Sequence, residues 1–176
     1  MEFSDVIKNR YSCKKFSSEQ IGKDKLDAIL EAGRVAPTAK NLQEQHIYVV
    51  QSESALETID KLTPCRYNAP TVLIVAYNKN NVFTYLGDKR NSGIEDATIV
   101  ATHLMLAAYN EGVDSCWINF FNPDELAKAF NLPEDEEILM LLDLGVADKT
   151  TTPLPNHNSR NCLLYTSPSP RDGLLS

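Results

Sequence analysis

The order of apolar and polar residues along this chain predicts four strands. Residues 71–77 and 138–146 are nearly continuous apolar runs, which are typical of buried strands. Residues 46–50 and 115–120 are rich in β-branched and aromatic side chains, which favours two further strands. The chain contains no visible internal repeat.

Apolar residues at helical spacing occupy the stretches between these strands. Residues 93–110 form the strongest predicted helix, and Gly112 is its stop signal. Weaker helices are predicted at 23–35, which Pro37 ends, at 54–62, in a short N-terminal segment capped by Ser4, and after Asn122, with Pro123 at the first helical position. Alternating strands and helices predict a three-layer α/β arrangement, and periodicity alone favours a parallel sheet.

A long polar connection precedes the strongest helix. Residues 78–92 are mostly polar but carry two aromatic side chains, Phe83 and Tyr85. Connections of this length are uncommon in compact domains and are usually functional lids or disordered segments.

Composition narrows the classes of function. The chain has 176 residues, is 43% hydrophobic and carries a net charge of −7, which predicts one acidic, soluble domain. No cluster of Lys and Arg indicates a nucleic-acid partner, and no apolar run is long enough to span a membrane. The polar start lacks the features of a secretory signal, and the four cysteines show no CxxC spacing. We therefore expect a cytoplasmic protein with reduced thiols.

The sequence lacks the motifs of several large enzyme classes. His46, His103 and His157 form no HExxH-type set, so no metal site is expected. GxSxG, Walker and GxGxxG motifs are missing, which argues against serine hydrolases, NTPases and Rossmann dehydrogenases. An enzyme with this sequence would depend on an organic cofactor.

Two polar segments are candidates for binding such a cofactor. If residues 10–14 are extended, Arg10, Ser12 and Lys14 project to one side and could grip a phosphate. On spacing alone, a solvated basic turn is the favoured interpretation of this segment. The amides of Asn41 and Gln43 could read the edge of a flavin pyrimidine ring, although their loop could equally be only a connection.

Five motifs in register resemble the nitroreductase family. Residues 10–16, RYSCKKF, are similar to its opening RxSx(R/K)xF, and residues 36–43, APTAKNLQ, are similar to its AP(S/T)xxNxQ segment. Residues 68–75 are similar to its central strand, 93–108 to its long helix, and 112–118, GVDSCWI, to its GxG(S/T)xW element. The order and spacing hold from about Phe3 to Arg160.

The resemblance implies a fold and an assembly. It implies an α+β fold, a three-layer α/β/α sandwich with a mixed, largely antiparallel sheet, which overrides the parallel arrangement that periodicity favours. It also implies an intimate homodimer with two FMN molecules at the subunit interface.

The resemblance further implies roles for individual residues. Arg10 and Ser12 would hold the ribityl phosphate, and Lys14 would lie near the flavin N1/O2 edge, where a cation stabilises the reduced ring. Thr38, Asn41 and Gln43 would line the ring or the neighbouring subunit's flavin. The full implied cofactor-binding set is Arg10, Tyr11, Ser12, Lys14, Pro37, Thr38, Asn41, Gln43, Ser115, Cys116 and Arg160. No catalytic side chain is expected because the flavin carries the chemistry.

The implied activity is ping-pong hydride transfer. NADH or NADPH would reduce FMN, and a small electrophile such as a nitroaromatic or a quinone would then take the electrons. Phe83, Tyr85, Phe120 and Phe121 are candidates to line the cleft, with core packing favoured for Phe120. The alternatives are a specialised relative that performs dehalogenation, azoline oxidation or flavin breakdown, and a flavin-binding protein without turnover.

Four residues depart from the family pattern. Glu44 and Asp143 stand where the family commonly has proline, Val146 replaces a tyrosine, and Asp114 replaces a glycine. If Asp114 points inward, it would repel an anionic cofactor.

The C-terminal stretch differs from the rest of the chain. Residues 162–172 resemble the translation of a sequencing adapter, although a Pro/Ser-rich disordered tail is the alternative. We therefore expect one FMN-binding domain at 1–161 and a non-native tail at 162–176.

Overall fold

The computed structural model describes residues 1–87 and 89–162. The expected non-native tail, apart from the exposed Cys162, lies outside the described residues. The elements in chain order are α1 (Phe3–Asn9), α2 (Lys23–Arg34), the 3₁₀ turn η1 (Ala39–Asn41), β1 (Gln45–Val50), α3 (Glu53–Leu62), the 3₁₀ turn η2 (Pro64–Arg66), β2 (Thr71–Asn78), α4 (Gly93–Asn110), β3 (Asp114–Ile118), α5 (Pro123–Ala129) and β4 (Glu136–Gly145). Every helix in the described ranges is too short or too polar to cross a membrane.

The four strands form one sheet in the order β1-β2-β4-β3, and all neighbours are antiparallel. The parallel sheet that periodicity favours is therefore wrong, and the α+β sandwich with a largely antiparallel sheet is confirmed. Across the described ranges, the one parallel pairing is an isolated bridge between Ser12 and Ser115, outside the named strands.

The direction of the strands follows from where the chain re-enters the sheet. Val50 at the end of β1 pairs with Val72 near the start of β2, so the segment containing α3 returns to the end of the sheet that it left. Strands β2 and β3 are both antiparallel to β4, so they run parallel to each other and α4 connects them. Strands β2 and β3 with α4 thus form a βαβ unit, with β4 inserted between its two strands.

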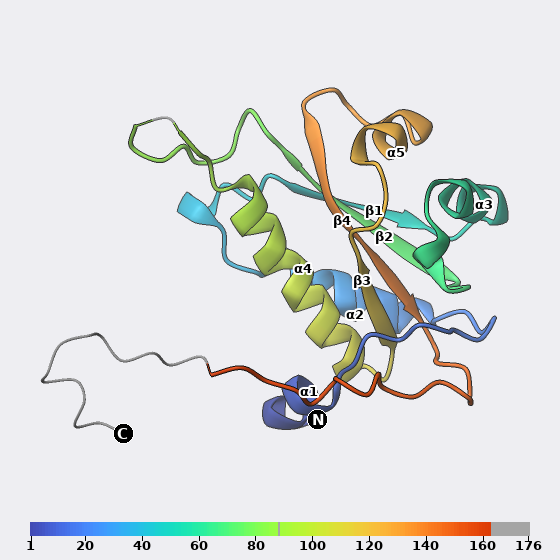
Figure 1. The fold of residues 1–176 in the computed structure, drawn as a ribbon. Coiled ribbons are helices and arrows are strands. Elements are labelled where there is room, and N and C mark those ends of the chain that lie inside the picture. The colour runs from blue at the N-terminus through green and yellow to red at the C-terminus, as the bar shows by residue number, and fades with distance from the viewer. Residues whose placement is uncertain (88, 163–176) are drawn as a thin grey trace, which may run out of the picture.

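Side chains alternate between the two faces of the central strands. On β2, Leu73, Val75 and Tyr77 pack in one apolar core with residues of α2 and α4. Val72, Ile74 and Ala76 pack in a second core with residues of α3, α5 and the N-terminal segment. These two cores lie between the sheet and the helices that cover its two faces. Figure 1 shows α4 crossing the sheet on the side of the first core.

Two glycines allow α4 to approach its neighbours closely. A Cβ at Gly33 of α2 would lie 2.6 Å from the Leu104 side chain of α4, and a Cβ at Gly93 would lie 2.2 Å from the Tyr77 ring. Larger residues at either position would force these buried groups apart. The position of α4 against β2 and α2 therefore depends on both glycines.

Candidate functional site

The N-terminal segment that follows α1 runs beside β3. Ser12 forms the parallel bridge to Ser115, and the Cys13 N–H donates to the Ser115 carbonyl oxygen at 2.9 Å. Cys13 is fully buried, while Ser12 and Lys14 on either side of it are exposed. The structure thus places Ser12 and Lys14 together on the open side of this segment, beside the start of β3.

The cations of this segment are available to a ligand. Within residues 1–87 and 89–162, neither Arg10 nor Lys14 forms a salt bridge or a side-chain hydrogen bond, and the Lys14 Nζ lies 6.0 Å from the centre of the Tyr67 ring. The two cations make this face suitable for an anionic group such as a phosphate.

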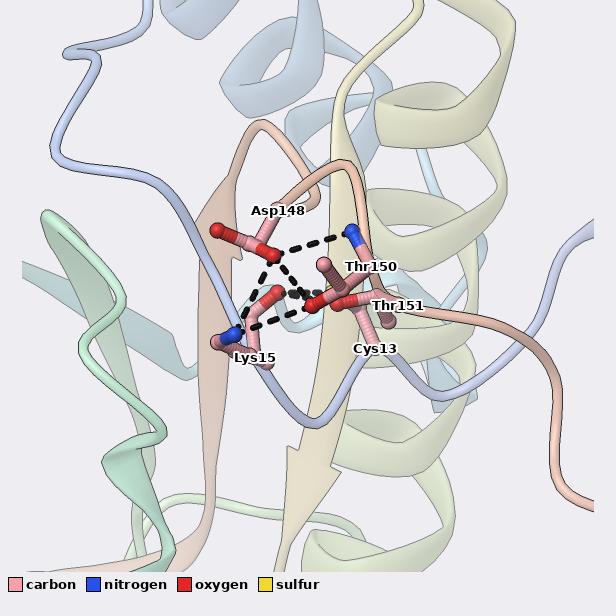
Figure 2. A network of polar contacts seen from close by, with 5 residues as sticks. All are labelled: Cys13, Lys15, Asp148, Thr150 and Thr151. Atoms are coloured by element: carbon pink, nitrogen blue, oxygen red, sulfur yellow. Dashed lines mark hydrogen bonds and ion pairs between the residues drawn. The ribbon is translucent and has the colours of Figure 1, made fainter.

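Lys15 differs from Lys14 because it is engaged in a polar network (Figure 2). Its Nζ donates to Thr150 Oγ1 at 2.9 Å and lies 3.2 Å from Asp148 Oδ1, while its carbonyl oxygen accepts from Thr151 Oγ1 at 2.9 Å. Hydrogen bonds from Thr150, followed by the Lys15 ammonium, lower the pKa of Asp148 to about 2. This network ties the N-terminal segment to the residues after β4.

The residues before Arg160 return to the same region. The His157 ring meets the Tyr11 ring edge-on at 6.5 Å, which brings this late segment next to the N-terminal one. The Arg160 guanidinium donates to backbone carbonyl oxygens, that of Ser159 at 2.8 Å and that of His157. We call one set of residues the grip group: Arg10, Tyr11, Ser12, Lys14, Ser115 and Cys116. Arg160 is the candidate residue that follows the segment next to this group.

The remaining candidate residues lie in the loop at 37–43, between α2 and β1. Lys40, Asn41 and Gln43 all adopt left-handed backbone conformations, with φ of 52°, 56° and 57°. Such conformations cost about 1 kcal/mol or more for a non-glycine residue and persist where the surroundings enforce them. Hydrogen bonds from the Gln43 N–H to Thr38 Oγ1 at 3.1 Å and from the Asn41 N–H to the Thr38 carbonyl oxygen at 2.9 Å hold this shape.

Asp96 anchors this loop to α4, although sequence reasoning gave it no role. One carboxylate oxygen accepts from the Ala39 N–H at 2.8 Å, and the other accepts from Ser92 Oγ at 2.7 Å. Asp96 is buried and lies in the first turn of α4. An acidic residue four positions before Val100, within an apolar stripe, was the signal that could have revealed it.

A pocket of about 420 Å³ opens beside the loop, within the usual size range for small-molecule sites. Thr38 and Gln43 line it together with α2, β1 and Val100 of α4. We name Pro37, Thr38, Asn41 and Gln43, with this pocket, the loop group.

In the connection between β2 and α4, of which residues 79–87 and 89–92 are described, two arms pair as a hairpin next to the loop group. Thr84 bridges to Asn91, and the Lys40 ammonium lies 4.9 Å from the Phe83 ring. The Phe83 and Tyr85 rings are 5.3 Å apart, and the Arg90 guanidinium lies 4.2 Å from the Tyr85 ring. Each aromatic ring of the hairpin therefore has a cation beside it, Arg90 of the hairpin itself next to Tyr85 and Lys40 of the loop at 37–43 next to Phe83.

The grip and loop groups do not meet within one chain. The loop group is tied to the first turn of α4, whereas β3, which carries Ser115, begins after the last turn. Figure 1 shows α1 beside the C-terminal end of α4 and the cyan loop near its start. The helical rise between residues 96 and 110 puts the two groups about 20 Å apart.

Two other expectations are resolved by the geometry. Phe120 is 72% exposed, so the core packing favoured for it is wrong; it lies two residues beyond the last residue of β3, where its ring is in solvent. Asp114 accepts a hydrogen bond from the Ala147 N–H at 2.9 Å, so this departure from the family pattern fastens the chain after β4.

Among the residues described, no three His, Cys, Asp or Glu side chains come together to hold a metal ion.

Comparison with a family profile identifies the protein family of this chain. The profile described as "Nitroreductase family" matches residues 7–65 and 63–146, which is most of the chain. The chain belongs to the nitroreductase family. Both the grip group up to Cys116 and the loop group lie within the matched residues of this nitroreductase-family chain.

Individual relatives support the same assignment. A Bacillus subtilis protein named as the NAD(P)H nitroreductase YodC is 28% identical over 193 residues, which cover 88% of this chain and 92% of that protein. A nitroreductase family protein from Clostridium difficile superposes with a TM-score of 0.86 at 32% identity, covering 93% of this chain and 95% of the other. A nitroreductase of Exiguobacterium sibiricum, solved in complex with FMN, shares the fold with a TM-score of 0.76 at 20% identity, covering 92% and 97% of the two chains.

Replacing Asp96 by alanine should destabilise the protein and loosen the loop group. The change leaves the Ala39 N–H and the Ser92 hydroxyl without their acceptor, so we expect the free energy of unfolding to fall by about 1–3 kcal/mol. Hydrogen exchange at the Ala39 amide should accelerate. Glu95→Ala is the matched control, because Glu95 has only exposed partners and its loss should change stability by less than about 1 kcal/mol. Equal effects of the two substitutions would contradict the anchoring role.

Proposed function

We propose that this nitroreductase-family protein is an FMN-dependent oxidoreductase that takes reducing equivalents from NADH or NADPH and passes them to a small electrophile. The observation that carries this proposal is the pair of unpaired cations, Arg10 and Lys14, on an extended segment pinned to β3. Relatives named as NAD(P)H nitroreductases and a related fold in complex with FMN support it.

The grip group fits the phosphate end and one edge of FMN. Arg10 and Ser12 would hold the ribityl phosphate through charge-assisted hydrogen bonds, with Arg160 close enough in the chain fold to return to it. Backbone groups at Ser115 and Cys116 would lie against the ring. Tyr11 points the other way in the alternation, and its ring, packed on His157, would support the segment from behind.

Lys14 would act on the ring itself. Bound FMN would supply the hydride chemistry, accepting two electrons from the nicotinamide and releasing them to the acceptor. The Lys14 ammonium would stabilise the negative charge that builds up at the N1/O2 edge, because a fixed cation needs no reorganisation when that charge appears. Protons can come from solvent in an exposed cleft, so no side chain is assigned as a general acid.

The loop group would complete the site of a second subunit. The two groups lie about 20 Å apart at opposite ends of α4, so one ligand cannot touch both in one chain. A homodimer would bring Pro37, Thr38, Asn41 and Gln43 of one subunit to the grip group of the other. Exposed apolar side chains on α1 and α4, such as Phe3 at 67% and Ile94 at 56%, would form part of that contact.

The hairpin would then cover the acceptor. Phe83 and Tyr85 with the neighbouring Lys40 and Arg90 present aromatic faces and positive charge beside the loop group. Planar, electron-poor acceptors such as nitroaromatics and quinones suit such a surface, because they stack on aromatic rings and carry oxygen atoms that accept hydrogen bonds. Donor and acceptor would use the same open face in turn, which corresponds to a ping-pong mechanism.

A visible spectrum tests the activity. Protein reconstituted with FMN should show the flavin absorbance band, lose it on anaerobic addition of NADH or NADPH, and regain it when menadione or a nitrofuran is added. A protein that binds FMN but is never bleached by either nucleotide would instead be a binding protein without turnover. A protein that does not bind FMN at all would contradict the proposal.

Replacing Arg10 by alanine should weaken FMN binding. Loss of a charge-assisted phosphate contact removes about 1.5–3 kcal/mol, which corresponds to roughly 10- to 150-fold in the dissociation constant. Quenching of FMN fluorescence measures the change. Lys8→Ala is the control, because it removes the same charge from the exposed surface of α1, two residues earlier. Similar affinities of the Arg10 and Lys8 variants would show that Arg10 does not contact the phosphate.

Mixing two variants tests the composite site. Arg10→Glu should disable the grip group, and Asn41→Asp should disable the loop group while keeping a residue type that tolerates a left-handed backbone. In a 1:1 mixture refolded together, half of the dimers would be mixed and would contain one intact site, so about one quarter of all sites should recover. Each variant alone should stay weakly active. No recovery in the mixture, with dimers present, would mean that each chain builds its own site.

A further inference from the structure

Asp143 is a buried acid without a partner. It lies on β4 between Val72 of β2 and Cys116 of β3, which are its cross-strand neighbours. Its exposed fraction is 0%, and neither carboxyl oxygen has a hydrogen-bond partner. Isolated buried carboxylates are strongly disfavoured, so this position calls for a physical account.

The groups around Asp143 do not offer it a hydrogen-bonded counter-ion. Its titratable and charged neighbours are Cys116 on β3, Cys13 on the N-terminal segment, Cys65, Arg66 and Tyr67 at η2, and Asp60 on α3. Arg66 is the one cation among these six, and it is already engaged. It donates to Asp60 Oδ1 and to the Ala69 carbonyl oxygen, both at 2.7 Å, and also to Asp60 Oδ2.

These surroundings favour the neutral acid. Burial raises the pKa of Asp143 to about 9, against a smaller opposing effect of Arg66. Burial likewise raises the pKa of Cys116 to about 12 and that of Cys13 to about 11. At neutral pH, therefore, neither Asp143 nor these two thiols place a negative charge beneath the grip group.

We propose that Asp143 is held as a neutral carboxylic acid so that Lys14, beside Cys116, keeps an uncompensated positive charge for the anionic cofactor, and that ionisation of Asp143 weakens that binding. This inference rests on the proposed function. Asp143 acts through its effect on the field at Cys116 and Lys14, so it is a positioning residue.

The size of the effect follows from the spacing of the strands. The Cα atoms of cross-strand neighbours are about 5 Å apart, and Ser12 bridges to Ser115 next to Cys116, so a phosphate held at Ser12 would lie about 10–15 Å from the Asp143 carboxyl group. Because a phosphate carries more than one negative charge at alkaline pH, ionisation of Asp143 at that distance in a protein interior should change the affinity by about tenfold or more. The effect should appear only where Asp143 ionises, at alkaline pH.

The test compares the full chain with Asp143→Asn, which keeps the shape and removes the ionisation, and with Asp143→Leu as a second neutral variant. FMN affinity is measured at pH 7 and pH 9.5 by fluorescence quenching. The wild-type protein and both variants should bind alike at pH 7. At pH 9.5, half a unit above the pKa of about 9, about three quarters of Asp143 is ionised, so only the wild type should lose about threefold in affinity relative to the variants.

Infrared spectroscopy of the flavin-free protein provides an independent readout. The wild type at pH 7 should show the carbonyl stretch of a protonated carboxylic acid, which alkaline titration removes and which Asp143→Asn lacks. Absence of that band at pH 7 overturns the neutral acid. Suppose that the band is present but the FMN affinities of wild type and variants fall by the same factor from pH 7 to pH 9.5, or differ by the same factor at both pH values. The inference about Asp143 then fails, and the proposed function stands. If none of the three proteins binds FMN, the proposed function fails, and so does the role of Asp143 in tuning FMN affinity, while the infrared band still reports the protonation of Asp143.

Discussion

The packing of α4 across the sheet is the constraint on which the layout of the site depends. Its buried stripe lies against α2 and β2, and close contacts at Gly33 and Gly93 fix its position. Its first turn holds the loop group through Asp96, and its last turn leads into β3 and the grip group. Because a packed helix is rigid, the two groups are held at a fixed spacing of about 20 Å within one chain.

The kind and place of most elements could be predicted from the sequence because burial leaves a local pattern. The strongest helix was predicted at the residues that α4 occupies, and the predicted strands differ from β1–β4 only by a few residues at their ends. Asn122 caps α5 as expected, since its Oδ1 accepts from the Asp124 N–H at 3.1 Å. The expected Ser4 cap is wrong, because α1 begins at Phe3 without a side-chain cap.

Strand direction and long-range ties could not be read from the same pattern. Periodicity identifies buried faces, but it does not say from which end the chain re-enters the sheet, and only the resemblance supplied an antiparallel arrangement. The bond from Ala39 to Asp96 spans 57 positions, and that from Lys15 to Thr150 spans 135. For the site, motifs supplied the residue types, whereas the separation of the grip and loop groups emerged only in three dimensions.

The placement of acidic groups explains how an acidic protein can offer a positive site. Around the grip group, Asp148 is engaged by Lys15 and Thr150, and Asp114 accepts the Ala147 N–H. Asp143, the most deeply buried of these acids, has no partner, and burial favours its neutral form. Asp114 and Asp148 are thus held by hydrogen bonds, and burial favours the neutral form of Asp143, so the unpaired Arg10 and Lys14 give this face a positive charge within a chain whose net charge is −7.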